Sequence, residues 1–236
     1  MRAALFAAGL GTRLRPLTDR VPKCLVPIQR KPLLSYWLDL LMPAGIERVL
    51  INTHHLAAAV EEFVAQSRWR DRISVAHEQQ LLGTGGTLLR NRAFFEGKAF
   101  LAAHADNLTD FDAAAFLQRH LNRPANVAVT MMTFRTDSPR DCGIVEQDRD
   151  GIVRAFHEKV ARPPSDTANA AVYIFEPEVL EFLATLEKEV IDLSTEVIPH
   201  FIGRICTFHN DRYHRDIGTP ASLQQAERDF AARPGR

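Results

Sequence analysis

Residues 3–18 read AALFAAGLGTRLRPLT, and a Pro-Lys pair follows at residues 22–23. The apolar run 3–8 is short and ends at a glycine, which is typical of a buried strand. Gly9 and Gly11 let the backbone turn tightly, so that successive NH groups can face an anion. Positive charge stands beside these dipoles on Arg13, Arg15 and Lys23. The stretch therefore predicts a strand that ends in a phosphate loop suited to a triphosphate.

Two well-known glycine loops do not match this stretch. The dinucleotide-binding fingerprint needs a third glycine where this chain has Leu14, and the P-loop pattern G-x-x-x-x-G-K-S/T is absent. A plain glycine turn with solvated arginines is the alternative, but such turns seldom need this many basic residues and two prolines. We therefore interpret the loop as a phosphate site of another kind.

Length and composition exclude several classes of protein. The 236 residues suffice for one large α/β domain, which we favour over two small ones. An apolar fraction of 46% and a charged fraction of 25% are ordinary for a globular protein and argue against disorder. Lys plus Arg and Asp plus Glu number 29 each, so the chain lacks the basic surplus of nucleic-acid binders. We expect no nucleic-acid partner.

Cysteine usage and hydropathy predict the compartment. The three cysteines are Cys24, Cys142 and Cys206. They are far apart and lack C-x-x-C spacing, which argues against a disulfide framework and a structural zinc site. No run approaches the roughly 18 apolar residues of a membrane span, and the first strand begins without a cleavable signal. We expect a cytoplasmic protein that does not enter a membrane, and we leave a homodimer open.

Apolar runs and helical patterns alternate along the first part of the chain. Further strands are expected at 49–51, 73–75 and 100–103, and helices at 32–42, through 60–64 and at 88–95. Short strands joined through helices pair in parallel, with right-handed crossovers. From residue 126 on, hairpin signals replace crossovers, with a strand at 126–134, a hairpin over 142–156, a strand at 205–209 and a final helix at 221–231. The predicted class is α/β, with a Rossmann-like, mostly parallel sheet, flanking helices and a small antiparallel extension.

The opening stretch resembles the first motif of the sugar-1-phosphate nucleotidylyltransferase family, L-A-A-G-x-G-T-R-L-x-P-L-T followed by P-K. Later segments resemble further motifs of that family, namely LGTGG at 82–86, FHEK at 156–159, NAAVYIF at 169–175 and RDIGTP at 215–220. Together these motifs span nearly the whole chain. The resemblance implies the nucleotide-diphospho-sugar transferase type of fold as a single domain, 1–236. Its nucleotide-binding half would cover about 1–125 and its sugar-phosphate-binding half about 126–236.

The resemblance also implies the roles of individual residues. Arg13 would hold the phosphates that leave, Lys23 would bridge the α-phosphoryl oxygens and the sugar phosphate, and Asp106 completes the catalytic set. Asp106 and Asp216 would hold Mg²⁺. The nucleotide would contact Ala7, Ala8, Gly9, Gly11, Thr12, Arg13, Gln79, Gly83 and Thr84. The sugar phosphate would contact Asn107, Gly143, Glu158, Lys159, Asn169 and Asp192.

Several positions depart from the family pattern. Gly85 stands where an alanine is usual, and Ala105 replaces the glycine that precedes the metal-binding aspartate. A valine follows Lys159 where proline is usual. Ala171 replaces a glycine that lets the sugar approach the backbone. We therefore expect a sugar pocket shaped differently from the common hexose version.

The same residues allow structural alternatives. Asp106 follows a predicted strand, where open α/β sheets bind ligands, but it could also be a capping or loop residue. Thr84 could cap a helix, and residues 192–196 look like a capped helix start. Glu158 with Lys159 could be a solvated pair, and Asn169 a strand-edge residue. For His54 and His55, polar loop contacts are favoured over metal ligation, because adjacent residues at a strand end point in opposite directions.

The favoured function is the transfer of a nucleoside monophosphate from an NTP to a sugar 1-phosphate, which gives an NDP-sugar and pyrophosphate. GTP with a mannose- or heptose-type sugar is preferred, and a uridylyltransferase acting on an amino-sugar 1-phosphate is the nearest alternative. A catalytically silent nucleotide-sugar-binding regulatory subunit stays open, as does an enzyme that acts on a non-sugar phosphate such as phosphocholine or a molybdopterin. A silent regulator would not need the complete set of Arg13, Lys23, Asp106 and Asp216.

Overall fold

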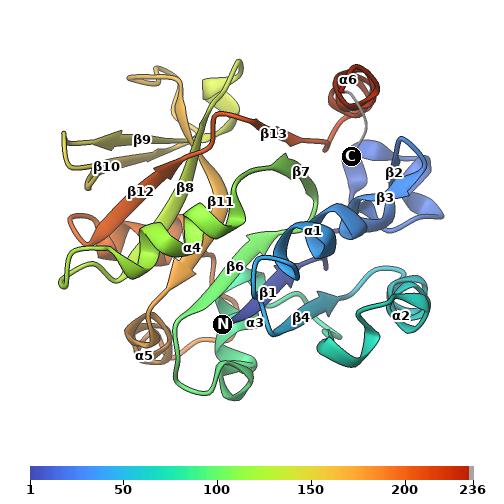
Figure 1. Cartoon of the computed structure of the whole chain (residues 1–236), viewed down its shortest axis with the longest axis horizontal. Helices are drawn as coiled ribbons and strands as arrows, with labels where there is room; N and C mark the ends of the chain where they lie inside the picture. The colour runs from blue at the N-terminus through green and yellow to red at the C-terminus, as the bar shows by residue number, and fades with distance from the viewer. Residues whose placement is uncertain (234–236) are drawn as a thin grey trace. The chain divides into compact units, whose positions relative to one another are not determined.

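The structure is a computed structural model, and it describes residues 1–233. Packing divides the chain into two compact units (Figure 1). The smaller unit contains residues 4–81, 104–110 and the segment that begins at Tyr213, and the larger unit contains residues 1–3, 82–103 and 111–212. Each unit is thus built from segments that are far apart in sequence. The predicted division near residue 125 concerns the binding of two substrates, and it stays a prediction.

Parallel strands form the centre of the smaller unit. β4 (Arg48–Thr53) and β5 (Ile73–His77) pair in parallel, with Leu50 opposite Ser74. All residues of β4 after Arg48 are buried, which is expected for a strand covered on both faces. β1 (Arg2–Phe6) lies beside β4. The strands predicted at the start of the chain are confirmed.

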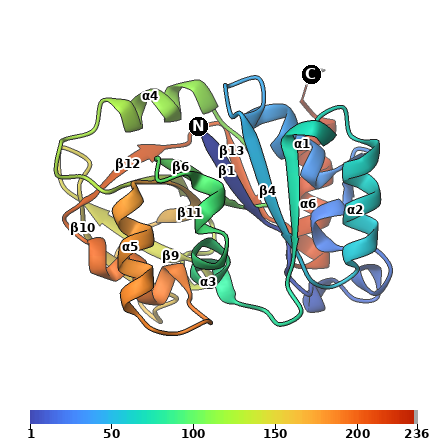
Figure 2. The ribbon, with the colours of Figure 1, turned by 90° about the horizontal axis from the view of Figure 1, so that it is seen from below.

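Three helices complete the smaller unit: α1 (Leu33–Leu41), α2 (Ala57–Gln66) and α6 (Pro220–Ala231). α1 begins after Pro32, as predicted, and buries one broad apolar face that includes Leu34, Trp37 and Leu41. α6 begins at a capping box in which Thr219 and Ser222 bond each other's backbone NH groups. The colours of Figure 2 show the end of the chain, in α6, within the same unit as α1 and α2 from its beginning.

Two short antiparallel pairs in the smaller unit lie outside the predicted elements. β2 (Pro27–Ile28) pairs with β3 (Lys31–Pro32). β7 (Asn107–Asp110) pairs with β13 (Tyr213–Asp216), and Asp216 lies opposite Asn107. The second pair returns the late part of the chain to the smaller unit.

The larger unit is built around β11 (Thr167–Phe175), which pairs antiparallel with β6 (Phe100–His104), β8 (Val129–Arg135) and β9 (Gly143–Gln147). β12 (Ile205–His209) runs parallel to β8. β9 and β10 (Val153–Glu158) form an antiparallel hairpin, whose turn is closed by the Gly151 NH donating to the Asp148 carbonyl. The hairpin and the antiparallel extension are therefore confirmed.

The helices of the larger unit are α3 (Gly83–Arg90), α4 (Ala113–Leu121) and α5 (Pro177–Thr185), with a π-helical turn over Leu193–Val197. The helix predicted at 88–95 is displaced. It begins at Gly83 and ends at Arg90, and a separate 3₁₀ turn follows at Arg92–Phe95. The glycines read as a loop signal, but they lie in the first turn of the helix.

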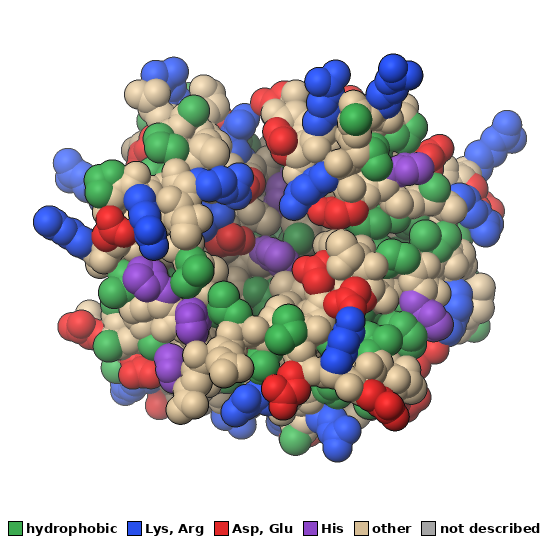
Figure 3. Space-filling view, turned by 180° about the vertical axis from the view of Figure 1, so that it is seen from behind, with side chains coloured by type: hydrophobic (Ala, Val, Ile, Leu, Met, Phe, Trp, Pro, Cys, Tyr) green, Lys and Arg blue, Asp and Glu red, His purple; other side chains and the backbone are tan. Residues whose placement is uncertain are grey.

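The described part of the chain has the predicted α/β class, with parallel central strands in the smaller unit and mostly antiparallel ladders in the larger one. Among residues 1–233, no helix is long and apolar enough to cross a membrane. Acidic and basic side chains are interspersed on the face shown in Figure 3, in keeping with the equal totals of the two charges.

Candidate functional site

The phosphate loop after β1 is folded by its own contacts. Gly11 has a φ of 62°, and a Cβ at this position would lie 2.8 Å from Cγ2 of Thr18. The Thr18 hydroxyl donates to the Gly11 carbonyl at 2.7 Å. Short 3₁₀ turns at Thr12–Leu14 and Leu17–Asp19 complete the loop. Only glycine fits this left-handed, crowded position without strain, which supports the sequence-based interpretation of Gly11.

A buried polar chain holds the start of the loop. The Ala7 NH donates to Oδ1 of Asn52 at 2.7 Å, and Nδ2 of Asn52 donates to Oε1 of Glu78 at 3.0 Å. Sequence reasoning missed both Asn52 and Glu78. The only signal was the position of Asn52 directly after a predicted strand. Because the Ala7 NH is used within the protein, a hydrogen bond between Ala7 and a nucleotide would involve the Ala7 carbonyl.

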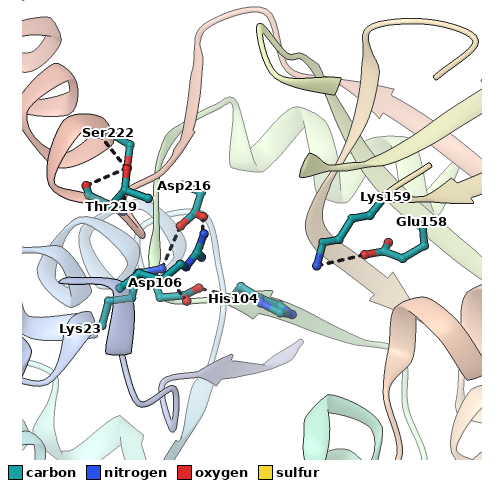
Figure 4. Close-up of polar contacts among 9 residues, drawn as sticks. Lys23, His104, Asp106, Glu158, Lys159, Asp216, Thr219 and Ser222 are labelled. Atoms are coloured by element: carbon teal, nitrogen blue, oxygen red, sulfur yellow. Dashed lines mark hydrogen bonds and ion pairs between the residues drawn. The ribbon is translucent and has the colours of Figure 1, made fainter. Parts of the chain in front are cut away.

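Lys23 joins the two predicted metal ligands (Figure 4). Its Nζ lies 2.9 Å from Oδ2 of Asp106 and 2.8 Å from Oδ1 of Asp216. The lysine side chain is only 6% exposed. Burial alone would lower the pKa of Lys23, but the charges and hydrogen bonds of Asp106 and Asp216 raise it above its ordinary value of 10.5. The amino group is therefore a charged ammonium between two carboxylates.

The fold explains how residues 110 positions apart meet at one nitrogen. Asp106 follows β6, and the next residue, Asn107, pairs with Asp216 in the β7–β13 ladder. Both carboxylates bond the same nitrogen, so they lie well within the roughly 8 Å that a shared magnesium ion would allow. Burial opposes ionisation of Asp106, yet Lys23 and His104 lower the pKa of Asp106 below its usual 3.8.

Arg13 completes this cluster from the phosphate loop. Its Nη2 lies 3.3 Å from Oδ2 of Asp216, and the side chain is 66% exposed. A Cβ at Gly218 would lie 2.6 Å from that nitrogen and 2.9 Å from the Asp216 oxygens, so a side chain at this position would displace the pair. A pocket of about 340 Å³ opens beside these groups and is lined by Leu10, Gly11, Thr12, Arg13, Lys23, Leu81, Asp106 and Gly218.

The donor set at this pocket fits a magnesium ion. Mg²⁺ binds through one or two protein carboxylates plus phosphate and water oxygens, and Asp106 and Asp216 supply two carboxylates. Among residues 1–233, no group of three or more His, Cys, Asp and Glu side chains could hold a metal by itself. Phosphate and water oxygens would complete the coordination of such an ion.

The nearby histidines make other contacts. Nδ1 of His54 lies 2.7 Å from the Glu78 carbonyl, and Nε2 of His55 lies 3.0 Å from the Thr18 carbonyl, as expected for polar loop contacts. His104 packs edge-on against Phe6. Burial lowers the pKa of His214 to about 4, although Asp216 opposes this shift. His214 is therefore neutral at pH 7.

The remaining predicted residues of the smaller unit are less closely tied to the cluster. Gln79 is exposed, whereas Ala8 is buried. The Asn107 carbonyl accepts a hydrogen bond from Nε1 of Trp37 at 2.9 Å. Gly9 approaches the cluster, since a Cβ on it would lie 3.9 Å from Oδ2 of Asp106.

A second cluster lies in the larger unit around the hydroxyl of Tyr173. Nδ2 of Asn169 donates to this hydroxyl at 2.6 Å, and Oδ1 of Asn169 accepts from the Ala171 NH at 2.9 Å. Burial raises the pKa of Tyr173, and the charges of Glu158 and Asp192 add to this effect. Ser194 also bonds the Tyr173 hydroxyl. Three predicted sugar-side residues thus gather around a tyrosine that sequence reasoning left out.

Gly143 and Lys159 adjoin this second cluster. Gly143 pairs with Glu158 between β9 and β10, and a Cβ on Gly143 would lie 2.7 Å from Oε2 of Glu158. Nζ of Lys159 lies 3.4 Å from Oε1 of Glu158 (Figure 4). Lys159 has a φ of 49°, which places its side chain at a turn where β10 ends. Glycine at 143 leaves room for the Glu158 carboxylate.

The capping alternatives have different outcomes. Asp192 caps the π-helical turn, because its Oδ1 accepts from the Thr195 NH at 2.9 Å. Thr84 does not cap α3, whose N-cap position is Leu82. The Thr84 hydroxyl instead accepts from the Leu193 NH at 2.9 Å. Thr84 lies one residue inside the helix because that helix starts earlier than predicted.

Comparison with known proteins decides the family. Residues 2–233 match the family model described as Nucleotidyl transferase. The chain belongs to this family. It is 32% identical over 233 residues to a mannose-1-phosphate guanylyltransferase from Mycobacterium tuberculosis, a match that covers 97% of this chain and 64% of the relative. It is 29% identical over 250 residues to a UTP--glucose-1-phosphate uridylyltransferase from Synechocystis, with 99% of this chain and 64% of the relative covered.

Solved structures of this nucleotidyl transferase fold agree over the whole length. A putative glucose-1-phosphate thymidylyltransferase from Bacillus anthracis superposes with a TM-score of 0.90 at 18% identity, covering 100% of this chain and 97% of the other. HddC from Yersinia pseudotuberculosis, in complex with GMP-PN, superposes with a TM-score of 0.80 at 24% identity, covering 97% and 99%. At these identities the likeness concerns the fold. The predicted family of sugar-1-phosphate nucleotidylyltransferases is confirmed, and the chain spans 64% of the length of each of the two curated relatives named above.

Proposed function

We propose that the protein transfers a nucleoside monophosphate from an NTP to a sugar 1-phosphate, releasing pyrophosphate. The observation that carries this proposal is the Lys23 ammonium, held by Asp106 and Asp216 beside the phosphate loop. An oxygen of the sugar phosphate forms a bond to the α-phosphorus while the bond from that phosphorus to the β-phosphate oxygen breaks. The nucleophile is already ionised, so the reaction needs positioning and charge neutralisation more than a base.

The residues of the site can supply both requirements. Lys23 would contact the α-phosphoryl oxygens, where negative charge increases in the transition state. Arg13, whose side chain is exposed, would bind the phosphates that leave. Asp106 and Asp216 fit Mg²⁺, and that ion, when bound, supplies further positive charge against the triphosphate.

GTP with a mannose- or heptose-type sugar is our preferred substrate pair. The relative named for guanylyl transfer supports it. The relative named for uridylyl transfer supports the alternative, in which UTP is the nucleotide substrate. A cytoplasmic location is part of the same proposal.

The decisive experiment is a panel of four NTPs against mannose, heptose, glucose and N-acetylmuramic acid 1-phosphates and phosphocholine, read by pyrophosphate release. We expect GTP with mannose or heptose 1-phosphate to react fastest, and Lys23→Ala to abolish release with every pair. Fastest reaction of UTP with the amino sugar would select the uridylyl alternative. Release with phosphocholine alone would contradict a sugar substrate. Nucleotide binding without release in the whole panel would indicate the silent regulator.

A further inference from the structure

A short segment of the larger unit, residues 189–193, lies directly on the start of α3; we call it the strap. The Ile191 NH donates to the Leu82 carbonyl at 2.9 Å, and the Gly85 NH donates to the Ile191 carbonyl at 2.8 Å. The Leu193 NH donates to the Thr84 hydroxyl at 2.9 Å. These bonds join the strap to residues 82–86, the segment implied in nucleotide binding.

The glycines of residues 82–86 are what permit this contact. A Cβ on Gly83 would lie 2.4 Å from the Ile191 carbonyl oxygen, and one on Gly86 would lie 2.1 Å from the Glu189 carbonyl oxygen. A Cβ on Gly85 would lie 2.7 Å from Cγ2 of Ile191. Gly85 is also the position where the family pattern has alanine, so the departure matches the space that Ile191 occupies.

The strap continues directly into the second cluster, the one around the Tyr173 hydroxyl. Asp192 belongs to the strap, and its NH donates to Oε2 of Glu196 at 2.8 Å while its carboxylate caps the turn at Thr195. Ser194, the next residue after the strap, bonds the Tyr173 hydroxyl, which also receives the bond from Asn169. Segment 82–86 and the Tyr173 cluster are thus joined through five residues of well-bonded backbone.

We propose that the strap is a positioning element that couples the two substrate subsites. This inference rests on the proposed function. A nucleotide that orders residues 82–86 also fixes the strap, and with it Asp192 and the side chains around Tyr173. The side chains that contact the sugar phosphate are then already ordered, so less conformational entropy is lost when the sugar phosphate binds. The affinity of the protein for the sugar phosphate therefore rises. By linkage, the sugar phosphate strengthens nucleotide binding by the same factor.

Thr84 offers the sharpest test, because its hydroxyl accepts the hydrogen bond from the Leu193 NH of the strap. Thr84→Val keeps the shape and removes the acceptor, whereas Thr84→Ser keeps the hydroxyl. Thr136→Val is the matched control. Its hydroxyl also accepts a backbone NH, that of Ser138 at 3.1 Å, and it belongs to none of the predicted substrate contacts.

The measurement is the dissociation constant of the sugar 1-phosphate with and without a saturating α,β-methylene analogue of the NTP, using the pair selected by the panel. The analogue replaces the bond that would break, so no turnover occurs. In the wild type we expect the analogue to tighten sugar-phosphate binding by about fivefold or more. Thr84→Val should lower this ratio, because one of the bonds between the strap and residues 82–86 is lost, while Thr84→Ser and Thr136→Val should keep the wild-type ratio. Because the analogue is saturating, a direct loss of nucleotide affinity in Thr84→Val does not affect the ratio.

Hydrogen exchange of the wild type gives a second readout that needs no variant. The analogue should slow exchange of the Ile191 and Leu193 NH groups, which bond residues 82–86. A wild-type ratio of one, a ratio unchanged in Thr84→Val, or unchanged exchange at both NH groups would overturn the coupling. If both compounds bind without coupling, only the strap inference fails, whereas absence of binding by both would overturn the proposed function as well.

Discussion

At the scale of single residues, one buried cation organises the candidate site. Lys23 is 6% exposed, but its partners Asp106 and Asp216 are 29% and 50% exposed. Without the ammonium, the two carboxylates would face each other and repel. The lysine therefore stabilises the fold locally as well as serving the proposed reaction.

Lys23→Met should lower turnover by several orders of magnitude and also lower the free energy of unfolding. We expect a loss of about 1 to 3 kcal/mol, less than for a fully buried pair because Asp216 is half exposed. Magnesium chloride alone should raise the melting temperature of the variant more than that of the wild type, since the ion replaces the missing charge. Thermal unfolding with and without the salt measures this difference. Lys31→Met is the control, because Lys31 pairs with Asp39 at 2.8 Å on the surface. An equal magnesium response in all three proteins would argue against a cation site at Asp106 and Asp216.

Asn169→Ala and Glu158→Gln should raise the KM for the sugar phosphate more than the KM for the NTP. Asn169 donates to the Tyr173 hydroxyl, and Glu158 faces the same cluster in the larger unit. Steady-state kinetics with each substrate varied in turn would measure both constants. Equal increases in the two constants would contradict a separate sugar-side cluster.

The residues of the candidate site were predictable where a linear motif contains them. Lys23, Asp106 and Asp216 follow from short patterns, and the structure brings all three together. Asn52, Glu78 and Tyr173 were missed because their role is to bond other protein groups. Such roles depend on partners that are distant in sequence, so a local sequence pattern does not predict these roles.

At the scale of elements, β11 carries an irregularity that sequence reasoning only partly anticipated. Its register with β8 shifts between Asn169 and Tyr173, and Ala171 lies in the left-handed region with a φ of 53°. A bulge of this kind turns side chains to a new direction. Here it lets Oδ1 of Asn169 accept the Ala171 NH. The family glycine that Ala171 replaces therefore lies at a strained backbone position.

Ala171→Gly should make the protein more stable by up to about 1.5 kcal/mol. Glycine removes roughly 1 to 2 kcal/mol of left-handed strain, and its greater freedom in the unfolded chain costs about 0.5 to 1 kcal/mol of that gain. Urea unfolding at equilibrium measures the difference. Ala170→Gly is the matched control: Ala170 is fully buried and has no left-handed φ, so glycine there should destabilise. A loss of stability in Ala171→Gly equal to that of the control would show that the bulge carries no strain.

The elements that sequence reasoning missed are short and paired over long distances. The alternating strands and helices at the start of the chain and the β9–β10 hairpin have local signals, and both are confirmed. The β7–β13 pair has four residues in each strand and joins segments about a hundred positions apart. Hydrophobic periodicity does not specify such a pair, because neither strand is long enough to show a period.

At the scale of the whole molecule, a buried histidine contributes to the response to acid. His120 in α4 is 1% exposed, with Nδ1 at 2.8 Å from the Thr130 hydroxyl and Nε2 at 2.9 Å from Oε1 of Glu176. Burial lowers the pKa of His120, and Arg123 lowers it further, while Glu176 opposes the shift. The folded protein therefore keeps this histidine neutral at pH values where the unfolded chain is already protonated.

The sign of the pH dependence follows from this difference. The unfolded chain takes up the proton near the ordinary pKa of 6.5, whereas the folded chain takes it up only at lower pH. The contribution to stability is thus fully present above pH 6.5 and is lost as the pH falls below it, with a slope of at most about 1.4 kcal/mol per pH unit for one histidine. His120→Gln removes the titrating group, so its free energy of unfolding should fall less steeply than that of the wild type between pH 6.5 and 5. His77→Gln, at an exposed position, is the control for the loss of a histidine. Urea unfolding across this pH range measures all three slopes, and a wild-type slope in His120→Gln would mean that the acid response originates elsewhere in the chain.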